Sequence, residues 1–253
     1  LYQNVSSYLN NNNNIINFIP FNAYTAGAYL NCVIRPLMGI GTDYFLLDYN
    51  NYKDKKNIAL FNHYNFISNN VFMNKRGFSI SRNPNISMHR YGVYYSGKTK
   101  VDWKTLEILP FYNATASNCG VSWVSHAIGG YYGGVEDSEL FIRYVQFGTF
   151  SPILMLASEG GKYYKREPWK WNVKTSTIVK EYLLLRHKLI PYIYSEAYKY
   201  SENGVPLIKP IYYTDKNLYD DELFFDVVQI FRDLYIMCHI ALRLVSVCVK
   251  NRA

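Results

Sequence analysis

Residues 43–49 read DYFLLDY, an apolar run with Asp43 and Asp48 near its two ends. A short continuous run of this kind is typical of a strand that is buried on both faces of a parallel sheet. Further strands are predicted at residues 15–21 (IINFIPF), 78–81 (FSIS), 91–96 (YGVYYS), 121–126 (VSWVSH) and 151–157 (SPILMLA).

Helical patterns separate these strands. Helices are predicted at residues 23–38, closed by Gly39 and Gly41, at 56–74, at 101–118 with a break at Pro110, at 136–147, and at 176–203 with an interruption at Pro191. Because strands and helices alternate along most of the chain, the sequence predicts an α/β fold with a parallel sheet. Repeats of this length favour a (β/α)8 TIM-type barrel over a doubly wound sheet.

Composition limits the classes of partner. The chain has 253 residues, 49% of them hydrophobic, which suits one large domain more simply than two small ones. The formal net charge of +8 would suit an anionic partner, and residues 162–174 do interleave basic and aromatic side chains as a single-strand binder would. Basic residues are otherwise scattered, so we interpret this stretch as a solvated loop with a few packed aromatics and expect no nucleic-acid partner.

The four cysteines form no CxxC pair and have no histidine at metal-ligand spacing. We expect free thiols, a reducing cytoplasmic location and no metal. No signal peptide and no uncharged apolar run of about 18 residues are apparent, so we expect no membrane partner. The first residue is Leu1 and not methionine, which is consistent with a fragment.

In a barrel, functional residues are expected at the carboxyl ends of the strands. Those ends carry Asp48, Arg82, Lys98 and His126. Each of these residues could also have a purely structural role instead of a functional one. We interpret His126 as a satisfied core histidine and not a base.

The strand-end blocks resemble a known family. In order and spacing, LLDYN, SRNPNISMHRYGVYYSGKT, SHAIGGYYGG, ELFIRYVQFGTFSPI, YYKREPW and LRHKLIPYIYSEAYKY are similar to the catalytic barrel of glycoside hydrolase family 31, the α-glucosidase and α-xylosidase family, from about residue 15 to residue 213. The resemblance implies a retaining mechanism with two carboxyl groups roughly 5 to 5.5 Å apart, one attacking the anomeric carbon and the other serving as acid and base. It implies a carbohydrate substrate and no metal or organic cofactor.

The resemblance also implies roles for individual residues. Asp48 matches the nucleophile, Arg82 matches the arginine that holds the sugar, and Tyr95 and Tyr131 fall where aromatic rings line the subsite. Two structural alternatives stay open. Asp48 could make only a hydrogen bond at the barrel end, and Arg82 could only pair with Asp48 or Asp43.

Lys98 occupies the position of the family's acid/base aspartate. The ordinary pKa of a lysine ammonium is about 10.4, which makes it a poor acid toward a glycosidic oxygen. Lys98 could instead point to solvent or pair with Asp48. Asp102 is expected in the first helical turn and Glu107 on a solvated face, so neither replaces the missing acid.

Other family positions also differ. Ala127 stands where an aspartate usually meets sugar hydroxyls, Met155 and Ala157 stand where arginine and histidine are frequent, and Leu46 stands where tryptophan is common. Several polar groups of one subsite are therefore replaced together.

The ends of the chain depart from the family pattern. We expect a partial barrel over residues 1–222, lacking about half of a barrel and the flanking β-domains, and an aberrant amphipathic tail over residues 223–253. Residues 224–249 have the periodicity of an amphipathic helix, and the divergence suggests a shifted reading frame.

The sequence leads to three hypotheses. The first is a retaining α-glycoside hydrolase that acts on α-linked glucosides, xylosides or related glycans, with activity limited by Lys98. The second is a non-catalytic carbohydrate-binding relative, and the third is a non-functional gene fragment.

Overall fold

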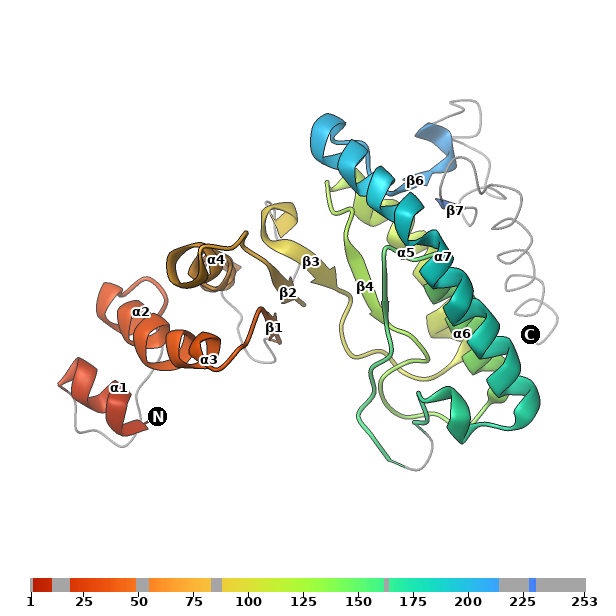
Figure 1. The fold of residues 1–253 in the computed structure, drawn as a ribbon, viewed down its shortest axis with the longest axis horizontal. Coiled ribbons are helices and arrows are strands. Elements are labelled where there is room, and N and C mark those ends of the chain that lie inside the picture. The colour runs from red at the N-terminus through yellow and green to blue at the C-terminus, as the bar shows by residue number, and fades with distance from the viewer. Residues whose placement is uncertain are drawn as a thin grey trace. The chain divides into compact units, whose positions relative to one another are not determined.

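The computed structural model describes residues 2–10, 19–48, 55–82, 88–161, 164–213 and 228–230. The chain divides into two compact units, Leu1–Tyr95 and Ser96–Ala253, each with its own strands and helices (Figure 1). The boundary predicted between residues 222 and 223 lies outside the described residues and stays a prediction.

The first unit contains parallel strands β1 (Phe45–Leu47), β2 (Ser79–Ser81) and β3 (Gly92–Tyr95). β2 pairs with β1 and with β3, so that Leu47 lies opposite Ser81 and Ser81 opposite Tyr94. Helix α4 (Lys55–Met73) lies between β1 and β2 in the chain, and the 3-10 turn η2 (Met88–Tyr91) precedes β3. The predicted strands at 78–81 and 91–96 and the helix at 56–74 are confirmed.

Helix α1 (Tyr2–Leu9) precedes a long helical segment formed by α2 (Ala23–Tyr29), the π-helical turn η1 (Leu30–Ile34) and α3 (Arg35–Gly39). The Asn22 side chain caps its start by accepting from the N–H groups of Tyr24 and Thr25. In the π turn the Arg35 N–H donates to the Leu30 carbonyl, five residues back. Pro36 follows at once, and because proline has no N–H and crowds the carbonyl four residues before it, a wider turn fits there.

Strand β1 differs from its prediction in burial. Leu47 is buried, but Leu46 is 47% exposed, so the prediction of burial on both faces is wrong at this position. Among the described strands, β1 has a neighbour on one side only, which makes it an edge strand. The predicted strand at residues 15–21 lies mostly outside the described residues, and residues 19–21 form coil and turn.

The second unit continues the alternation of helices and parallel strands. β4 pairs in parallel with β5, and His126 lies opposite Leu154. The predicted helices and strands of this region are confirmed, with ends shifted by a few residues. The elements are α5 (Trp103–Asn118), β4 (Val124–Ala127), α6 (Ser138–Thr149), β5 (Ile153–Met155), η3 (Pro168–Lys170), α7 (Val173–Asn203), β6 (Ile208–Pro210), η4 (Ile211–Tyr213) and β7 (Val228–Ile230).

Two prolines lie inside continuous helices. Pro110 lies within α5 and Pro191 within α7, so the predicted breaks at these residues are wrong. A proline inside a helix removes one hydrogen bond and costs about 3 kcal/mol. Both helices are anchored by buried side chains near the proline, including Leu109 in α5 and Leu189 and Ile193 in α7.

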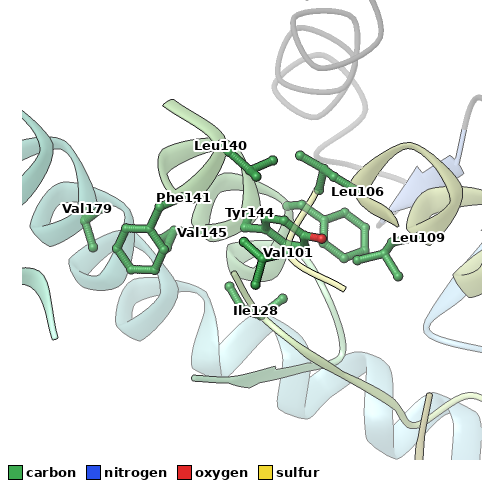
Figure 2. Close-up of a cluster of buried hydrophobic side chains, with 10 residues drawn as sticks. Val101, Leu106, Leu109, Ile128, Leu140, Phe141, Tyr144, Val145 and Val179 are labelled. Carbon is green, nitrogen blue, oxygen red and sulfur yellow. The ribbon is translucent and has the colours of Figure 1, made fainter. Parts of the chain in front are cut away.

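One hydrophobic cluster joins α5, α6 and α7 (Figure 2). Tyr144 and Val145 of α6 are fully buried, as are Leu106 of α5 and Val179 of α7. The remaining buried members are Val101, Leu109, Ile128, Leu140, Phe141 and Phe147. Because Val101 and Ile128 belong to the segments just after β3 and β4, this core supports the strand-end loops of the second unit.

The C-terminal part of the described chain pairs β6 with β7 in antiparallel fashion, with Lys209 opposite Gln229. The amphipathic helix predicted at residues 224–249 is therefore wrong at residues 228–230, and the rest of it lies outside the described residues. Cys32 and Cys119 are free thiols as predicted, whereas Cys238 and Cys248 lie outside the described residues. No helix within the described ranges combines the length and the apolar character of a bilayer span.

Candidate functional site

In the first unit, Asp48 and Arg82 follow the neighbouring strands β1 and β2. The parallel register places their strand ends side by side, and the Arg82 N–H donates to the Leu47 carbonyl at 3.2 Å. The Arg82 side chain also meets Asp48, with Nη1 3.0 Å from Oδ1. Asp43 instead pairs with Lys75 at 2.8 Å. Of the two partners open for Arg82, the structure therefore selects Asp48.

The Asp48–Arg82 ion pair is partly shielded from water, because the two side chains are 19% and 31% exposed. A guanidinium beside a carboxylate favours the ionised form of the carboxylate. An ionised, partly exposed carboxylate at a strand end is chemically suited to attack an electrophilic carbon.

Tyr95 ends strand β3 and is 3% exposed. The predicted role of its ring in lining a sugar subsite stays a prediction.

In the second unit, Lys98 and Tyr131 lie together. The Lys98 ammonium is 5.4 Å from the centre of the Tyr131 ring, a cation–π contact. The backbone supports this contact, because the Tyr131 N–H donates to the Thr99 carbonyl at 2.7 Å. Sequence reasoning placed both residues at one subsite without foreseeing that they contact each other.

His126 is a fully buried histidine with a partner for each ring nitrogen. Nδ1 lies 2.7 Å from Ser96 Oγ, and Nε2 lies 2.7 Å from Asn113 Oδ1. Since Asn113 Oδ1 can only accept, the Nε2–H donates to it and Nδ1 accepts from the Ser96 hydroxyl. Burial lowers the pKa of His126 to about 3. The interpretation as a satisfied core histidine is confirmed, and it ties the segment before Lys98 to β4 and α5.

Asp102 caps helix α5, where its side chain accepts from the Thr105 N–H at 2.8 Å. Burial raises its pKa, but hydrogen bonds from Thr105 and Lys100 outweigh that effect and lower the pKa below its ordinary value. Asp102 is thus the N-cap of α5, just before the first turn in which it was expected, and its lowered pKa favours the ionised carboxylate. Glu107 is exposed on α5, as predicted.

Two of the apolar residues that depart from the family pattern lie at the ends of strands. Ala127 ends β4 and is fully buried, and Met155 ends β5. The Met155 sulfur lies 3.9 Å from Ser125 Oγ. Among the described residues, no group of three or more His, Cys, Asp or Glu side chains could hold a metal ion.

Sequence reasoning missed Arg166. It lies in the stretch interpreted as a solvated loop, yet it is 8% exposed, and its guanidinium donates to the carbonyls of Gly129, Gly130 and Lys165. Trp171 of the same stretch stacks on Phe141 at 4.9 Å, whereas Trp169 is 76% exposed. The loop interpretation is therefore right for Trp169 and wrong for Arg166. The acceptors of Arg166 are backbone carbonyl groups, which every residue has, so no pattern of side chains in the sequence indicates this pairing.

Parallel strands joined by helices, with charged side chains following the carboxyl ends of the strands, define an α/β protein and are typical of a (β/α)8 barrel. Residues 6–196 match the family model described as the glycosyl hydrolases family 31 TIM-barrel domain. The chain belongs to glycoside hydrolase family 31 and contains an incomplete TIM barrel, which confirms the predicted fold class.

Curated relatives agree with this assignment. The chain is 30% identical over 155 residues to the alpha-xylosidase of Saccharolobus solfataricus, which covers 58% of this chain and 21% of that protein. It is 29% identical over 157 residues to neutral alpha-glucosidase AB of Dictyostelium discoideum, covering 61% and 16%. The chain thus spans about a fifth or less of the length of these relatives.

Solved structures show the same fold. A dextranase of family 31 from Flavobacterium johnsoniae, in complex with glucose, aligns with a TM-score of 0.71 at 21% identity and covers 82% of this chain and 29% of that one. An alpha-xylosidase of family 31 from a soil metagenome, in complex with xylose, aligns with a TM-score of 0.69 at 19% identity and covers 82% and 36%.

Proposed function

We propose that this chain is part of a retaining α-glycosidase in which Asp48 is the nucleophile. The observation that carries the proposal is the Asp48–Arg82 pair at the carboxyl ends of β1 and β2. In the proposed first step, an Asp48 oxygen attacks the anomeric carbon while the bond to the leaving oxygen breaks, which yields a glycosyl ester and an alcohol. Water then cleaves the ester, which releases the sugar and restores the carboxylate.

Arg82 and the two tyrosines are proposed to bind the sugar. The Arg82 guanidinium carries five N–H donors, and we propose that it binds sugar hydroxyls in addition to Asp48. Tyr131 is partly exposed and is proposed to offer its ring to a pyranose, and Tyr95 is proposed as a second ring of the subsite.

The leaving oxygen must take up a proton, and Lys98 stands at the position where the family supplies it. The Lys98 ammonium lies over the Tyr131 ring, and a lysine ammonium is a poor acid toward a glycosidic oxygen. General acid assistance is typically worth about 10² to 10⁴-fold in rate. We therefore propose slow turnover of natural glycosides and faster reaction of substrates whose leaving groups need no proton.

The substrate class is proposed from the named relatives. An alpha-xylosidase, neutral alpha-glucosidases and a dextranase are among them, so α-linked glucosides, xylosides or related glycans are the candidates. The same proposal includes a cytoplasmic location and a further barrel half and β-domains that complete the site. It also includes no cofactor and no nucleic-acid or membrane partner.

The second candidate is a carbohydrate-binding protein without turnover. The observation that favours it is the Lys98–Tyr131 contact at the acid/base position. It predicts saturable sugar binding with no covalent intermediate.

The deciding experiment is incubation of the purified chain with 5-fluoro-α-glucosyl fluoride and 5-fluoro-α-xylosyl fluoride, followed by intact-mass measurement and peptide mapping. Fluoride leaves without protonation, so a glycosyl adduct on Asp48, absent in Asp48→Asn, is expected. A chain that unfolds cooperatively, binds α-glycosides and yields no adduct would favour the binding protein. A chain that neither unfolds cooperatively nor binds would leave the gene-fragment hypothesis.

A further inference from the structure

The turn that follows β4 carries Tyr131. It contains Gly129 and Gly130, whose φ angles of +96° and +76° lie in the left-handed region that favours glycine. Beyond the glycines, the N–H groups of Tyr131 and Tyr132 both donate to the Thr99 carbonyl, and the Val101 N–H donates to the Tyr132 carbonyl at 2.9 Å. The turn is thus joined to the segment that follows Lys98.

Arg166 holds the other side of this turn. Its Nη2 donates to the Gly129 carbonyl at 2.9 Å and to the Gly130 carbonyl at 2.6 Å, while Nη1 donates to the Lys165 carbonyl at 3.0 Å. Its guanidinium carbon lies 5.9 Å from the centre of the Phe141 ring, one of the core side chains in Figure 2. The guanidinium is therefore held between the core and the turn.

The space around Gly129 fits this arginine closely. A Cβ atom at Gly129 would lie 2.8 Å from the Cζ and Nε atoms of Arg166, closer than real Cβ contacts come. A Cβ at Gly130 would lie 2.7 Å from Val101 Cα. The two glycines thus let the turn lie against Arg166 and Val101 at once.

We infer that Arg166 is a positioning residue, which fixes the Gly129–Gly130 turn and thereby sets the place of the Tyr131 ring against Lys98 and against a bound sugar. The part that concerns sugar rests on the proposed function. Without Arg166, the Gly129 and Gly130 carbonyls lose a shared buried donor, and the turn can shift away from Lys98. A misplacement of about 1 Å in a binding group is enough to reduce function by up to about 100-fold.

Arg186 provides a matched control. It is a partly buried arginine whose guanidinium donates to the carbonyls of Thr149, Ser151 and Pro152. Arg186→Met removes a similar set of bonds at the α6–β5 connection. A comparison of Arg166→Met with Arg186→Met therefore distinguishes an effect on the position of Tyr131 from a general loss of structure.

Two measurements are made on the full chain: amide hydrogen exchange at Tyr131 and Tyr132, and the affinity for methyl α-glucoside and methyl α-xyloside by NMR titration. In Arg166→Met we expect exchange at these amides to become at least about tenfold faster and the affinity to fall about tenfold or more. Arg186→Met should change neither. Arg166→Lys, which keeps the charge and a single donor nitrogen, should give intermediate values and serves where the methionine variant does not fold.

Unchanged exchange at Tyr131 in Arg166→Met, or equal changes in Arg166→Met and Arg186→Met, would overturn the inference. Binding of neither glycoside by the wild-type chain would count against the proposed function instead. In that case the exchange rates alone decide whether Arg166 holds the turn.

Discussion

The buried histidine permits a quantitative prediction about stability and pH. His126 is fully buried in the folded chain with a pKa of about 3, against an ordinary value of 6.5. Above pH 6.5 the imidazole is neutral in both the folded and the unfolded chain. Between pH 6.5 and pH 3 the unfolded chain binds a proton that the folded chain does not, so the free energy of unfolding falls as the pH falls.

The size of the effect follows from the same two pKa values. Each pH unit in that range removes about 1.4 kcal/mol of stability. Between pH 7 and pH 5 the loss that is due to His126 amounts to about 2 kcal/mol. The fold should therefore weaken well before the carboxylates begin to titrate.

The assay is urea unfolding at pH 7 and at pH 5, compared between wild type and His126→Gln. Glutamine does not titrate and retains a donor and an acceptor for Asn113 and Ser96, so its unfolding free energy should lack the loss of about 2 kcal/mol. His187→Gln, at an exposed histidine of α7, serves as the control and should behave as wild type. Equal pH dependence in wild type and His126→Gln would refute the reasoning and would show that His126 takes up a proton in the folded chain.

Two further predictions concern the site and the core. Lys98→Asp should raise kcat/KM for glycosides with poor leaving groups by about 10² to 10⁴-fold and leave glycosyl fluorides little affected. Lys98→Asn, which supplies no acid, should bring no such gain. If Lys98→Asp brings no gain either, residue 98 is not the acid/base position. Leu106→Ala, at a fully buried side chain, should lower the free energy of unfolding measured by urea titration by about 2 to 5 kcal/mol. Leu184→Ala, at a half-exposed position, should lower it by less than about 0.5 kcal/mol. Similar losses for both variants would contradict the described core.

The sequence predicted most elements because their hydrophobic patterns are local. It also placed Asp48 and Arg82 at the carboxyl ends of strands, which in a barrel share one edge of the sheet. The pairing of Arg82 with Asp48 and not with Asp43 could not be decided, because it depends on the register of Leu47 opposite Ser81.

Other features depend on packing that a sequence pattern does not show. Pro110 and Pro191 indicated helix breaks, but α5 and α7 are continuous and are anchored by buried side chains near each proline. An apolar run predicted a strand buried on both faces, and the edge position of β1 leaves Leu46 exposed. Arg166 was overlooked because an arginine among lysines and tryptophans is usually solvated, and its partners are carbonyl groups that every residue has.

An arginine that binds backbone carbonyls instead of a carboxylate side chain affects how this part of the chain can evolve. A salt bridge can be lost by substitution at either of two positions, but Arg186 binds the main chain at Thr149, Ser151 and Pro152, so side chains at those three positions can drift without removing an acceptor. All selective constraint on such an anchor falls on the arginine codon itself. We expect lineages that keep this architecture to retain Arg186 through substitutions at its acceptor positions, and to retain Gly129 together with Arg166, because the close contact between them requires glycine.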